Sequence, residues 1–283
     1  MMSRQKTTNT RDLGLEIATI CGRYFLKLEY LHYGYWNNGL EIDIANLHTA
    51  QESYTNFLIS HIPKGVQTIL DVGCGTGKIA KLLTGMGYLV DCVSPSPFLS
   101  EQASSLLGST SRIFRCPYEQ LDIERQYDLV LFSESFQYVA LEKGLEQTTR
   151  FLNNGGYLLI CDVFKKDVEG NGAIGGGHKV SRFFEMMKRH PFKIVVDEDI
   201  TEQTAPNIEI LDDAVKNVIA PALDSGLGFL SSKYPLTTKL LRWKYRKKIR
   251  SLCEKYLNGR RTNEDFKRFK TYRLFLYRKI CPS

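Results

Sequence analysis

From residue 68 onward, short runs of β-forming residues alternate with stretches long enough for helices, and this alternation restricts the fold more than any other feature. Seven runs are predicted as strands: 68–72, 88–93, 112–115, 128–132, 156–164, 192–196 and 271–279. Residues 69–72 and 128–132 are apolar apart from one acid residue each, as expected of central strands covered on both faces. We therefore predict an α/β fold with a Rossmann-like, doubly wound, mostly parallel sheet.

Helical patterns lie on both sides of this alternating region. Residues 13–31 and 45–61 have apolar side chains at three- and four-residue spacing, which predicts two helices before the sheet.

Residues 208–269 are also predicted to be helical, before the final strand. Asp212 and Asp213 mark one expected helix start, and Pro221 and Pro235 are expected to break helices.

The overall composition is that of an ordinary globular protein, with 43% apolar and 24% charged residues. No apolar run is long enough for a membrane span, and no apolar stretch follows the N-terminal charges, so a cytoplasmic protein is expected. The seven cysteines form no Cys-x-x-Cys pair and the histidines have no metal-ligand spacing. Reduced thiols are therefore expected, and neither disulfides nor a metal site.

A glycine-rich segment, Asp-Val-Gly-Cys-Gly-Thr-Gly-Lys-Ile, follows the first strand at residues 71–79. Glycines at a strand-to-helix turn let the backbone approach a ligand closely at the carboxyl edge of a parallel sheet. A dinucleotide fingerprint needs a third glycine where Lys78 stands, and a Walker loop needs Ser or Thr where Ile79 stands. Both of these phosphate-binding patterns fail, which leaves Asp-x-Gly-x-Gly-x-Gly.

This order of strand, glycine motif and helix resembles the class I S-adenosylmethionine (SAM)-dependent methyltransferases over residues 65 to 165, and the final strand resembles their antiparallel last strand. The resemblance implies that Asp71 orients the methionine amino group of SAM and that the three motif glycines wrap its amino-acid and ribose parts. The residues that it assigns to the cofactor are Asp71, Gly73, Cys74, Gly75, Gly77, Ser94, Pro95, Tyr118, Glu119 and Ser133.

Two positions depart from the family pattern. Ser94 stands where an acid residue usually holds the ribose hydroxyls, and Asp91 lies on the opposite face of the same strand by alternation. Pro117 stands where an Asp commonly meets the adenine amino group, so Tyr118 and Glu119 are expected to contact the base by backbone and stacking.

The segments after strands four and five are expected to face the methyl acceptor, because methyl transfer needs positioning and, for many nucleophiles, removal of a proton. The sequence resembles the subset that methylates sugars, quinones and tocopherols, in which a His often stands at the position of Tyr138 and pairs with an Asp like Asp162. Tyrosine is a poor base at neutral pH, so Glu134 and Asp162 are the stronger base candidates. Capping of loops is the alternative role for both.

His178 follows a glycine-rich stretch, residues 170–177, at the place where such enzymes carry an acceptor lid. It is a further catalytic candidate, and a solvated loop histidine is the alternative. The aromatic turn 31–36 resembles the turn that covers cofactor and acceptor in the same enzymes, although aromatic packing of the N-terminal helices onto the sheet explains it equally. The residues assigned to the acceptor are His32, Tyr33, Tyr35, Trp36 and Gln137.

Positive charge is concentrated near the C-terminus. Residues 235–270 hold 13 basic and 3 acidic residues, a net of +10, whereas the whole chain has +7. Within this segment, residues 239–257 form an amphipathic pattern that includes Trp243. A solvated face over a buried stripe is the default interpretation, and contact with an anionic membrane surface or an anionic acceptor is the functional one.

Together these features predict SAM-dependent methyl transfer to a small-molecule acceptor, amphipathic or anionic, with SAM as cofactor. The expected organisation is a helical cap at 1–64, a SAM-binding core at 65–207, a basic helical insertion at 208–270 and a final core strand at 271–283. Two alternatives remain: a nucleic-acid methyltransferase that docks through the basic helix, and a non-catalytic protein with the SAM-binding fold. No nucleic-acid-binding module is recognised, and the sequence does not define the oligomeric state.

Overall fold

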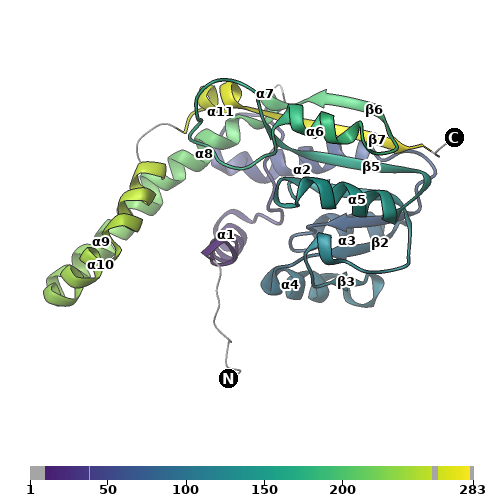
Figure 1. The fold of residues 1–283 in the computed structure, drawn as a ribbon. Coiled ribbons are helices and arrows are strands. Elements are labelled where there is room, and N and C mark those ends of the chain that lie inside the picture. The colour runs from purple at the N-terminus through teal and green to yellow at the C-terminus, as the bar shows by residue number, and fades with distance from the viewer. Residues whose placement is uncertain (1–9, 38, 257–260, 281–283) are drawn as a thin grey trace.

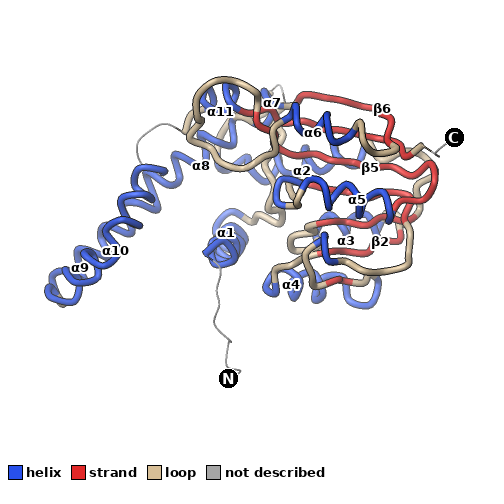
Figure 2. The backbone as a smooth tube through the Cα atoms, viewed as in Figure 1, coloured by secondary structure: helices blue, strands red, loops and turns tan. Residues whose placement is uncertain are grey.

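The computed structural model describes residues 10–37, 39–256 and 261–280. All seven predicted strands are present and form one sheet (Figures 1 and 2). The strands are β1 (Thr68–Val72), β2 (Leu89–Val93), β3 (Ile113–Phe114), β4 (Tyr127–Ser133), β5 (Leu152–Lys165), β6 (Phe192–Asp199) and β7 (Lys270–Lys279). The helices are α1 (Thr10–Leu26), α2 (Leu47–Ser60), α3 (Lys78–Gly85), α4 (Pro97–Leu107), α5 (Leu141–Phe151), α6 (Val180–Met187), α7 (Thr201–Thr204), α8 (Pro206–Ala214), α9 (Ala220–Lys233), α10 (Pro235–Tyr256) and α11 (Asn263–Phe269).

The sheet has the order β3-β2-β1-β4-β5-β7-β6, so the chain winds outward in two directions from β1 and β4. β7 runs antiparallel to both of its neighbours, β5 and β6, and the other strand pairs are parallel. The predicted doubly wound, mostly parallel sheet with an antiparallel last strand is confirmed. In a sheet of this kind ligands bind at the carboxyl edge, where the strand order reverses.

Side chains from alternate strand positions build a core on each face of the sheet. Ile69 packs with residues of α2, α3, α4 and α11 on one face. Leu70, its neighbour in β1, packs with residues of α5 and α6 on the other. This alternation explains why the central strands are apolar throughout, since both faces are covered.

The N-terminal helices differ in length from the prediction. α1 ends at Leu26 rather than at residue 31, because Lys27 takes a left-handed backbone conformation with φ +56°. Residues 27–33 then leave the helix, and part of this segment lines the cavities described below.

The helical segment before β7 is correctly predicted where the structure describes it, since residues 257–260 lie outside the described range, but two details are wrong. Asp212 and Asp213 lie inside α8 rather than at a helix start. Pro221 does not interrupt the helix. The π-helical turn Val215–Ile219 precedes it and gives the proline ring room beside the backbone carbonyl four residues earlier. Pro235 does separate two helices, α9 and α10.

α9 and α10 lie side by side and project away from the sheet (Figure 1). The default expectation of a buried apolar stripe on α10 is wrong, since Leu241, Tyr245 and Ile249 are all exposed. Both helices extend beyond the sheet and its covering helices (Figure 1). Their exposed apolar side chains are therefore not packed against the body of the protein. Within the described part of the chain, no helix has both the length and the apolar character needed to cross a bilayer.

Candidate functional site

A cavity of about 470 Å³ opens at the carboxyl ends of β1, β2 and β4. We call it the main cavity. It is lined by residues of the glycine motif, of the turns after β2 and β4, of the segment after β3, and of residues 30–32. Of the predicted site residues, Asp71, Gly73, Cys74, Gly75, Ser94, Pro95, Tyr118, Glu119, Ser133, Glu134, Tyr138 and His32 line it.

The motif glycines serve three different purposes. Gly73 has φ +78° and lies so close to Ser135 that a Cβ at this position would fall 2.4 Å from the Ser135 Cβ. Gly75 has φ +57° and faces the main cavity, with a Leu31 methyl group 3.6 Å from where its Cβ would be. Gly77 does not line the main cavity; its missing side chain lets the start of α3 approach Ala103 of α4. The loop thus brings bare backbone to the cavity and packs tightly behind it.

Asp71 lies at the floor of the main cavity and is 2% exposed. Its Oδ2 atom has no hydrogen-bond partner within the described part of the chain. Burial raises the pKa of this carboxyl to about 7. A buried carboxylate oxygen without a partner is costly in an empty site, and a cationic ligand group would satisfy it.

The turn after β2 contributes Ser94, which is 2% exposed and lines the main cavity. Asp91 points to the other face of the sheet, where it accepts hydrogen bonds from Arg125 at 2.9 Å and from the Tyr127 hydroxyl at 2.8 Å. A hydroxyl, rather than an acid, therefore faces the cavity from this strand.

The segment after β3 lines the cavity with Pro117, Tyr118 and Glu119. The Tyr118 hydroxyl lies 3.1 Å from the Thr148 hydroxyl, and its ring packs edge-on against Phe132 in the core. Glu119 accepts a hydrogen bond from the backbone N–H of Ala140. Because the Tyr118 ring packs in the core, mainly backbone atoms of this segment face the cavity.

Glu134 follows β4 in a left-handed backbone conformation with φ +52°, which is rare outside glycine. Its Oε1 atom accepts hydrogen bonds from the backbone N–H of Tyr33 at 2.7 Å and from the Tyr272 hydroxyl at 2.6 Å. Burial raises its pKa to about 8, against the opposing effect of these two hydrogen bonds. A strained residue with a raised pKa at a cavity is a typical feature of an acid–base site.

A chain of hydroxyl groups continues from Glu134 into the protein. The Tyr272 hydroxyl lies 3.2 Å from the Tyr54 hydroxyl, which donates to the carbonyl of Cys161 and lies 3.3 Å from the Ser133 hydroxyl. The network ties β7, α2 and the ends of β4 and β5 together. It fixes the position of Glu134 without exposing these tyrosines.

Asp162 and Gln137 do not line the main cavity, and they hold the turn after β4 in place. Asp162 is fully buried and accepts hydrogen bonds from the backbone N–H and the side-chain amide of Gln137, each at 3.0 Å. Burial raises the Asp162 pKa to about 7, while these hydrogen bonds oppose the shift.

His178 also contacts this turn rather than the main cavity. Its Nε2 donates to the carbonyl oxygens of Phe136 and Val139, at 3.1 Å each. Burial lowers its pKa. The glycine-rich stretch before it lies on the same turn, since a Cβ on Gly176 would fall 2.3 Å from Gln137 Oε1.

Residues 31–36 are clamped between α2 and α8. Asn207 of α8 makes two hydrogen bonds to the backbone of Gly34, at 2.8 and 2.7 Å. Tyr35 stacks on Phe57, and Trp36 is buried against α2 and α8. Tyr35 and Trp36 line neither cavity and thus fasten the turn.

His32 is buried in the wall of the main cavity and stacks on Tyr54. Its Nδ1 donates to the Tyr33 carbonyl at 2.8 Å, and its Nε2 lies 3.1 Å from the Thr55 hydroxyl. Burial lowers its pKa to about 4, so the ring is neutral at physiological pH.

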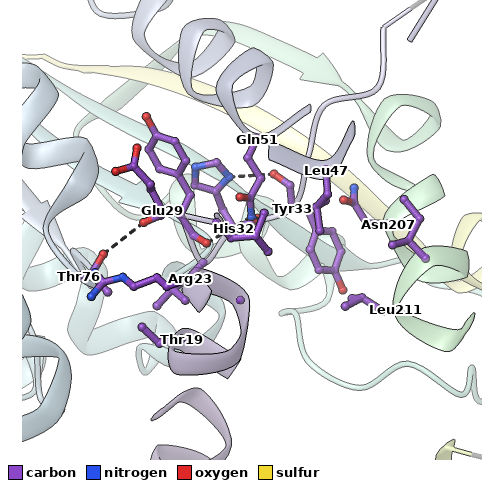
Figure 3. A pocket seen from close by; sticks show the side chains of 15 residues that line it. Thr19, Arg23, Glu29, His32, Tyr33, Leu47, Gln51, Thr76, Asn207 and Leu211 are labelled. Carbon is purple, nitrogen blue, oxygen red and sulfur yellow. Dashed lines mark hydrogen bonds between the residues drawn. The ribbon is translucent and has the colours of Figure 1, made fainter. Parts of the chain in front are cut away.

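A second cavity of about 160 Å³ adjoins the main cavity at residues 30–32 (Figure 3). It is formed by α1, α2, α8 and the segment after α1, with Tyr33, Asn207 and Leu211 among its lining residues. The Gln51 Oε1 atom at this cavity is buried and has no hydrogen-bond partner within the described residues. The two cavities share Tyr30, Leu31, His32 and Thr76.

Residues 70–160, which hold β1 to β5 and the glycine motif, match the family described as methyltransferase domain. Residues 70–160 are thus a methyltransferase domain by sequence similarity. A ubiquinone biosynthesis O-methyltransferase of Rickettsia bellii is 30% identical over 123 residues, which cover 40% of this chain and 50% of that protein. The chain spans about half the length of the curated relatives that it matches.

Solved structures resemble the methyltransferase domain and the surrounding helices together. A geranyl diphosphate C-methyltransferase from Streptomyces coelicolor has a TM-score of 0.66 at 15% identity, covering 97% of this chain and all of that one. The cyclase SpnF has a TM-score of 0.66 at 16% identity, covering 98% of both chains. At these identities the likeness shows a shared fold.

Several residues around the methyltransferase domain have no clear signal in the sequence. Tyr30, Leu31 and Thr76 line both cavities, and Lys78 forms a 2.6 Å ion pair with Glu29 that joins α3 to the N-terminal segment. Thr76 and Lys78 stand within the glycine-rich segment 71–79, and this is the signal by which the sequence could have indicated them. Nothing in the sequence around Tyr272 indicates that it reaches Glu134.

Proposed function

We propose that this chain is an enzyme that transfers the methyl group of SAM to a small-molecule acceptor. The observation that carries the proposal is the Oδ2 atom of buried Asp71, which has no hydrogen-bond partner among the described residues and lies beneath a glycine loop whose backbone faces a cavity of about 470 Å³. This arrangement fits a ligand with a cationic amino group and an extended body. The methyltransferase domain match over residues 70–160 supports the same cofactor.

The residues that would hold SAM follow from their positions in the main cavity. Asp71 would bind the amino group, the backbone of Gly73 and Gly75 would contact the amino-acid and ribose parts, and Ser94 would bind a ribose hydroxyl. The backbone from Pro117 to Glu119 would contact the adenine. When bound, SAM supplies a methyl group on a positively charged sulfur, and the chain supplies position and proton transfer.

Glu134 is the proton acceptor that the geometry favours. It lines the main cavity, its pKa is raised to about 8, and Tyr272 and Tyr33 fix its Oε1 atom. Asp162, Gln137 and His178 would position the turn that carries Tyr138, whose side chain is 56% exposed at the cavity. Tyr138 would orient the acceptor.

A small acceptor, amphipathic or anionic, fits the aromatic walls and the second cavity beside the first. The Rickettsia relative, whose name refers to ubiquinone biosynthesis, supports a small molecule. We further propose that residues 1–64 act as a helical cap, 65–207 with 271–283 as the SAM-binding core, and 208–270 as an insertion. The cap would include residues 30–32, which line both cavities.

Calorimetric titration with SAM and with S-adenosylhomocysteine tests the cofactor proposal. Gly75→Arg places a long side chain in the main cavity and should abolish binding. Gly85→Arg is the matched control, because Gly85 has no atom within 4 Å of its Cβ position and lies at the end of α3. Absence of SAM binding by the unaltered chain would contradict the proposal and favour a non-catalytic protein.

An acceptor panel measured by release of S-adenosylhomocysteine tests the reaction itself. Quinols, phenols, sugars and small carboxylic acids are the acceptor classes to compare, and transfer RNA and duplex DNA provide the nucleic-acid comparison. Turnover of a small molecule supports the proposal. Turnover restricted to nucleic acid would replace it.

A further inference from the structure

The hairpin formed by α9 and α10 has almost no buried surface of its own. It extends from the body of the protein beyond the sheet and its covering helices (Figure 1). Among the hairpin side chains that the structure describes, Thr238 is the buried one; its hydroxyl lies 3.1 Å from the Leu230 carbonyl and 2.8 Å from the Tyr234 carbonyl. Every other side chain described there is at least partly exposed.

The exposed side chains of this hairpin are largely apolar. Trp243 is 64% exposed and Leu236, at the start of α10, is 82% exposed. The exposed large apolar residues are Leu223, Leu227, Phe229, Leu230, Tyr234, Leu236, Leu240, Leu241, Trp243, Tyr245 and Ile249. Eleven exposed large apolar side chains in the described part of one hairpin indicate an interaction site.

The two helices differ in charge. α9 contains one acidic residue, Asp224, and one basic residue, Lys233. α10 contains eight basic residues and one acidic residue, Glu254, a net of +7. A neutral, mostly apolar helix therefore lies beside a strongly basic amphipathic helix.

From this combination we infer that the hairpin binds the surface of an anionic phospholipid membrane. Apolar side chains of both helices enter the boundary between headgroups and acyl chains, while lysines and arginines of α10 reach the lipid phosphates. Trp243 and Tyr245 lie on the basic helix, and aromatic rings of this type favour the membrane interface.

Charge argues against the two other kinds of partner. A second copy of the chain would bring one helix of net charge +7 close to another, which costs electrostatic energy. Nucleic acid would satisfy the basic residues of α10 but would leave Leu223, Leu227 and Phe229 of α9 in water.

The position of the hairpin also connects it to the two cavities. Helix α8 runs through the π-helical turn Val215–Ile219 into α9, and its residues Ile210 and Leu211 line the second cavity. That cavity shares the wall of residues 30–32 with the main cavity. The helix that lines the second cavity is thus continuous with the hairpin.

Binding to vesicles tests this inference without any need for methyl transfer. The full chain is titrated with phosphatidylglycerol vesicles and with phosphatidylcholine vesicles, each with a small fraction of lipid brominated in its acyl chains. The chain has two tryptophans, of which Trp36 is 6% exposed and Trp243 is 64% exposed. Bromine should quench Trp243 in the anionic vesicles, and a Trp243→Phe chain should show almost no quenching.

Two sets of substitutions locate the binding surface. Lys239→Glu, Arg242→Glu and Arg250→Glu together should weaken binding to phosphatidylglycerol vesicles on the order of 100-fold or more. Leu236→Ser with Leu240→Ser should weaken it without altering charge. The matched control reverses three exposed lysines on the body, Lys64, Lys188 and Lys193, and should bind nearly as well as the unaltered chain.

Four results would overturn the inference. They are absence of binding to anionic vesicles, equal binding to phosphatidylcholine, equal loss in the control variant, and quenching that persists without Trp243. Tighter binding to RNA than to vesicles, or dimerisation that shields Trp243 in the absence of lipid, would also overturn it. Circular dichroism of each variant shows that the helices are retained, so a loss of binding is not a loss of fold.

Discussion

The side chain of Ser135 fills the space that a side chain on Gly73 would need. A Cβ on Gly73 would fall 2.4 Å from the Ser135 Cβ, and the Ser135 hydroxyl donates to the carbonyl of Val72. The loop after β1 and the turn after β4 are thereby held together at the main cavity. The position of the glycine motif thus depends on a residue more than 60 positions away in the chain.

Gly73→Ala should lower the free energy of unfolding by about 2–4 kcal/mol, because the left-handed backbone and the contact with Ser135 both oppose a side chain. Urea denaturation measures this loss. Gly65→Ala is the control, since Gly65 has φ +89° but no atom within 4 Å of its Cβ position, and it should cost about 1–2 kcal/mol. Equal losses at the two positions would show that the Ser135 contact is unimportant.

SAM affinity should depend on pH through Asp71. Its pKa of about 7 means that the empty site holds a proton below pH 7, which a cationic amino group must displace. Affinity should rise up to tenfold for each pH unit toward 7 and then level off. Calorimetry in buffers of different ionisation enthalpy measures the released proton, and a pH-independent affinity would contradict this role.

Asp71→Asn is the matched variant for that measurement. It should weaken SAM binding by about 10- to 150-fold, the equivalent of a charged hydrogen bond of about 1.5–3 kcal/mol. Asp71→Asn should weaken SAM binding but stabilise the ligand-free protein near neutral pH. The folded chain holds a proton on Asp71 that the unfolded chain releases near pH 4, so stability falls as pH rises from about 4 to about 7. The Asn variant should have a flatter profile over this range.

Glu134→Gln should reduce methyl transfer by about 100-fold or more, as expected for loss of a general base. The amide oxygen still accepts from Tyr33 and Tyr272, so SAM affinity should remain within about twofold. With the pKa of Glu134 at about 8, the rate for the unaltered chain should rise with pH and level off above 8. A Gln variant with normal turnover would exclude Glu134 as the base.

Tyr272→Phe provides an independent readout of the same base. The Tyr272 hydroxyl lowers the Glu134 pKa through its hydrogen bond. Its removal should therefore shift the rising limb of the rate profile to higher pH. An unchanged limb would mean that another group controls the profile.

His178→Ala should act on stability more than on chemistry. The ring donates to the carbonyls of Phe136 and Val139, and its loss should cost about 1–3 kcal/mol because those acceptors are partly buried. Thermal unfolding measures this cost, and the pH dependence of methyl transfer should keep its shape. His190→Ala, which removes a half-buried histidine near Thr149, is the control. A large loss of turnover with normal stability would instead make His178 catalytic.

The sheet and the glycine loop could be predicted because their signals are local. The runs that contain Ile69 and Leu129 are apolar apart from one acid residue each, and the glycine motif follows its strand directly. Asp91 and Ser94 could be placed on opposite faces by strand alternation alone. These properties depend on neighbouring residues, which a sequence shows.

The contacts of the site could not be predicted, because they join distant parts of the chain. Glu134 and Tyr272 are 138 positions apart, and the bond between Asn207 and Gly34 spans 173 positions. The exposure of α10 could not be predicted either. An amphipathic pattern gives the spacing of apolar residues but does not show whether another element covers them. The expected helix break at Pro221 is wrong, because a π-helical turn upstream can accommodate a proline.

The hairpin enters the chain between β6 and β7, which are neighbours in the sheet. The elements at its two ends, α8 and α11, pack against each other. The helices on either side of the hairpin in the chain thus lie next to each other on the body. The hairpin itself contains no strand of the sheet. A change in the length of the hairpin would therefore leave the strand order, the glycine loop and Asp71 as they are.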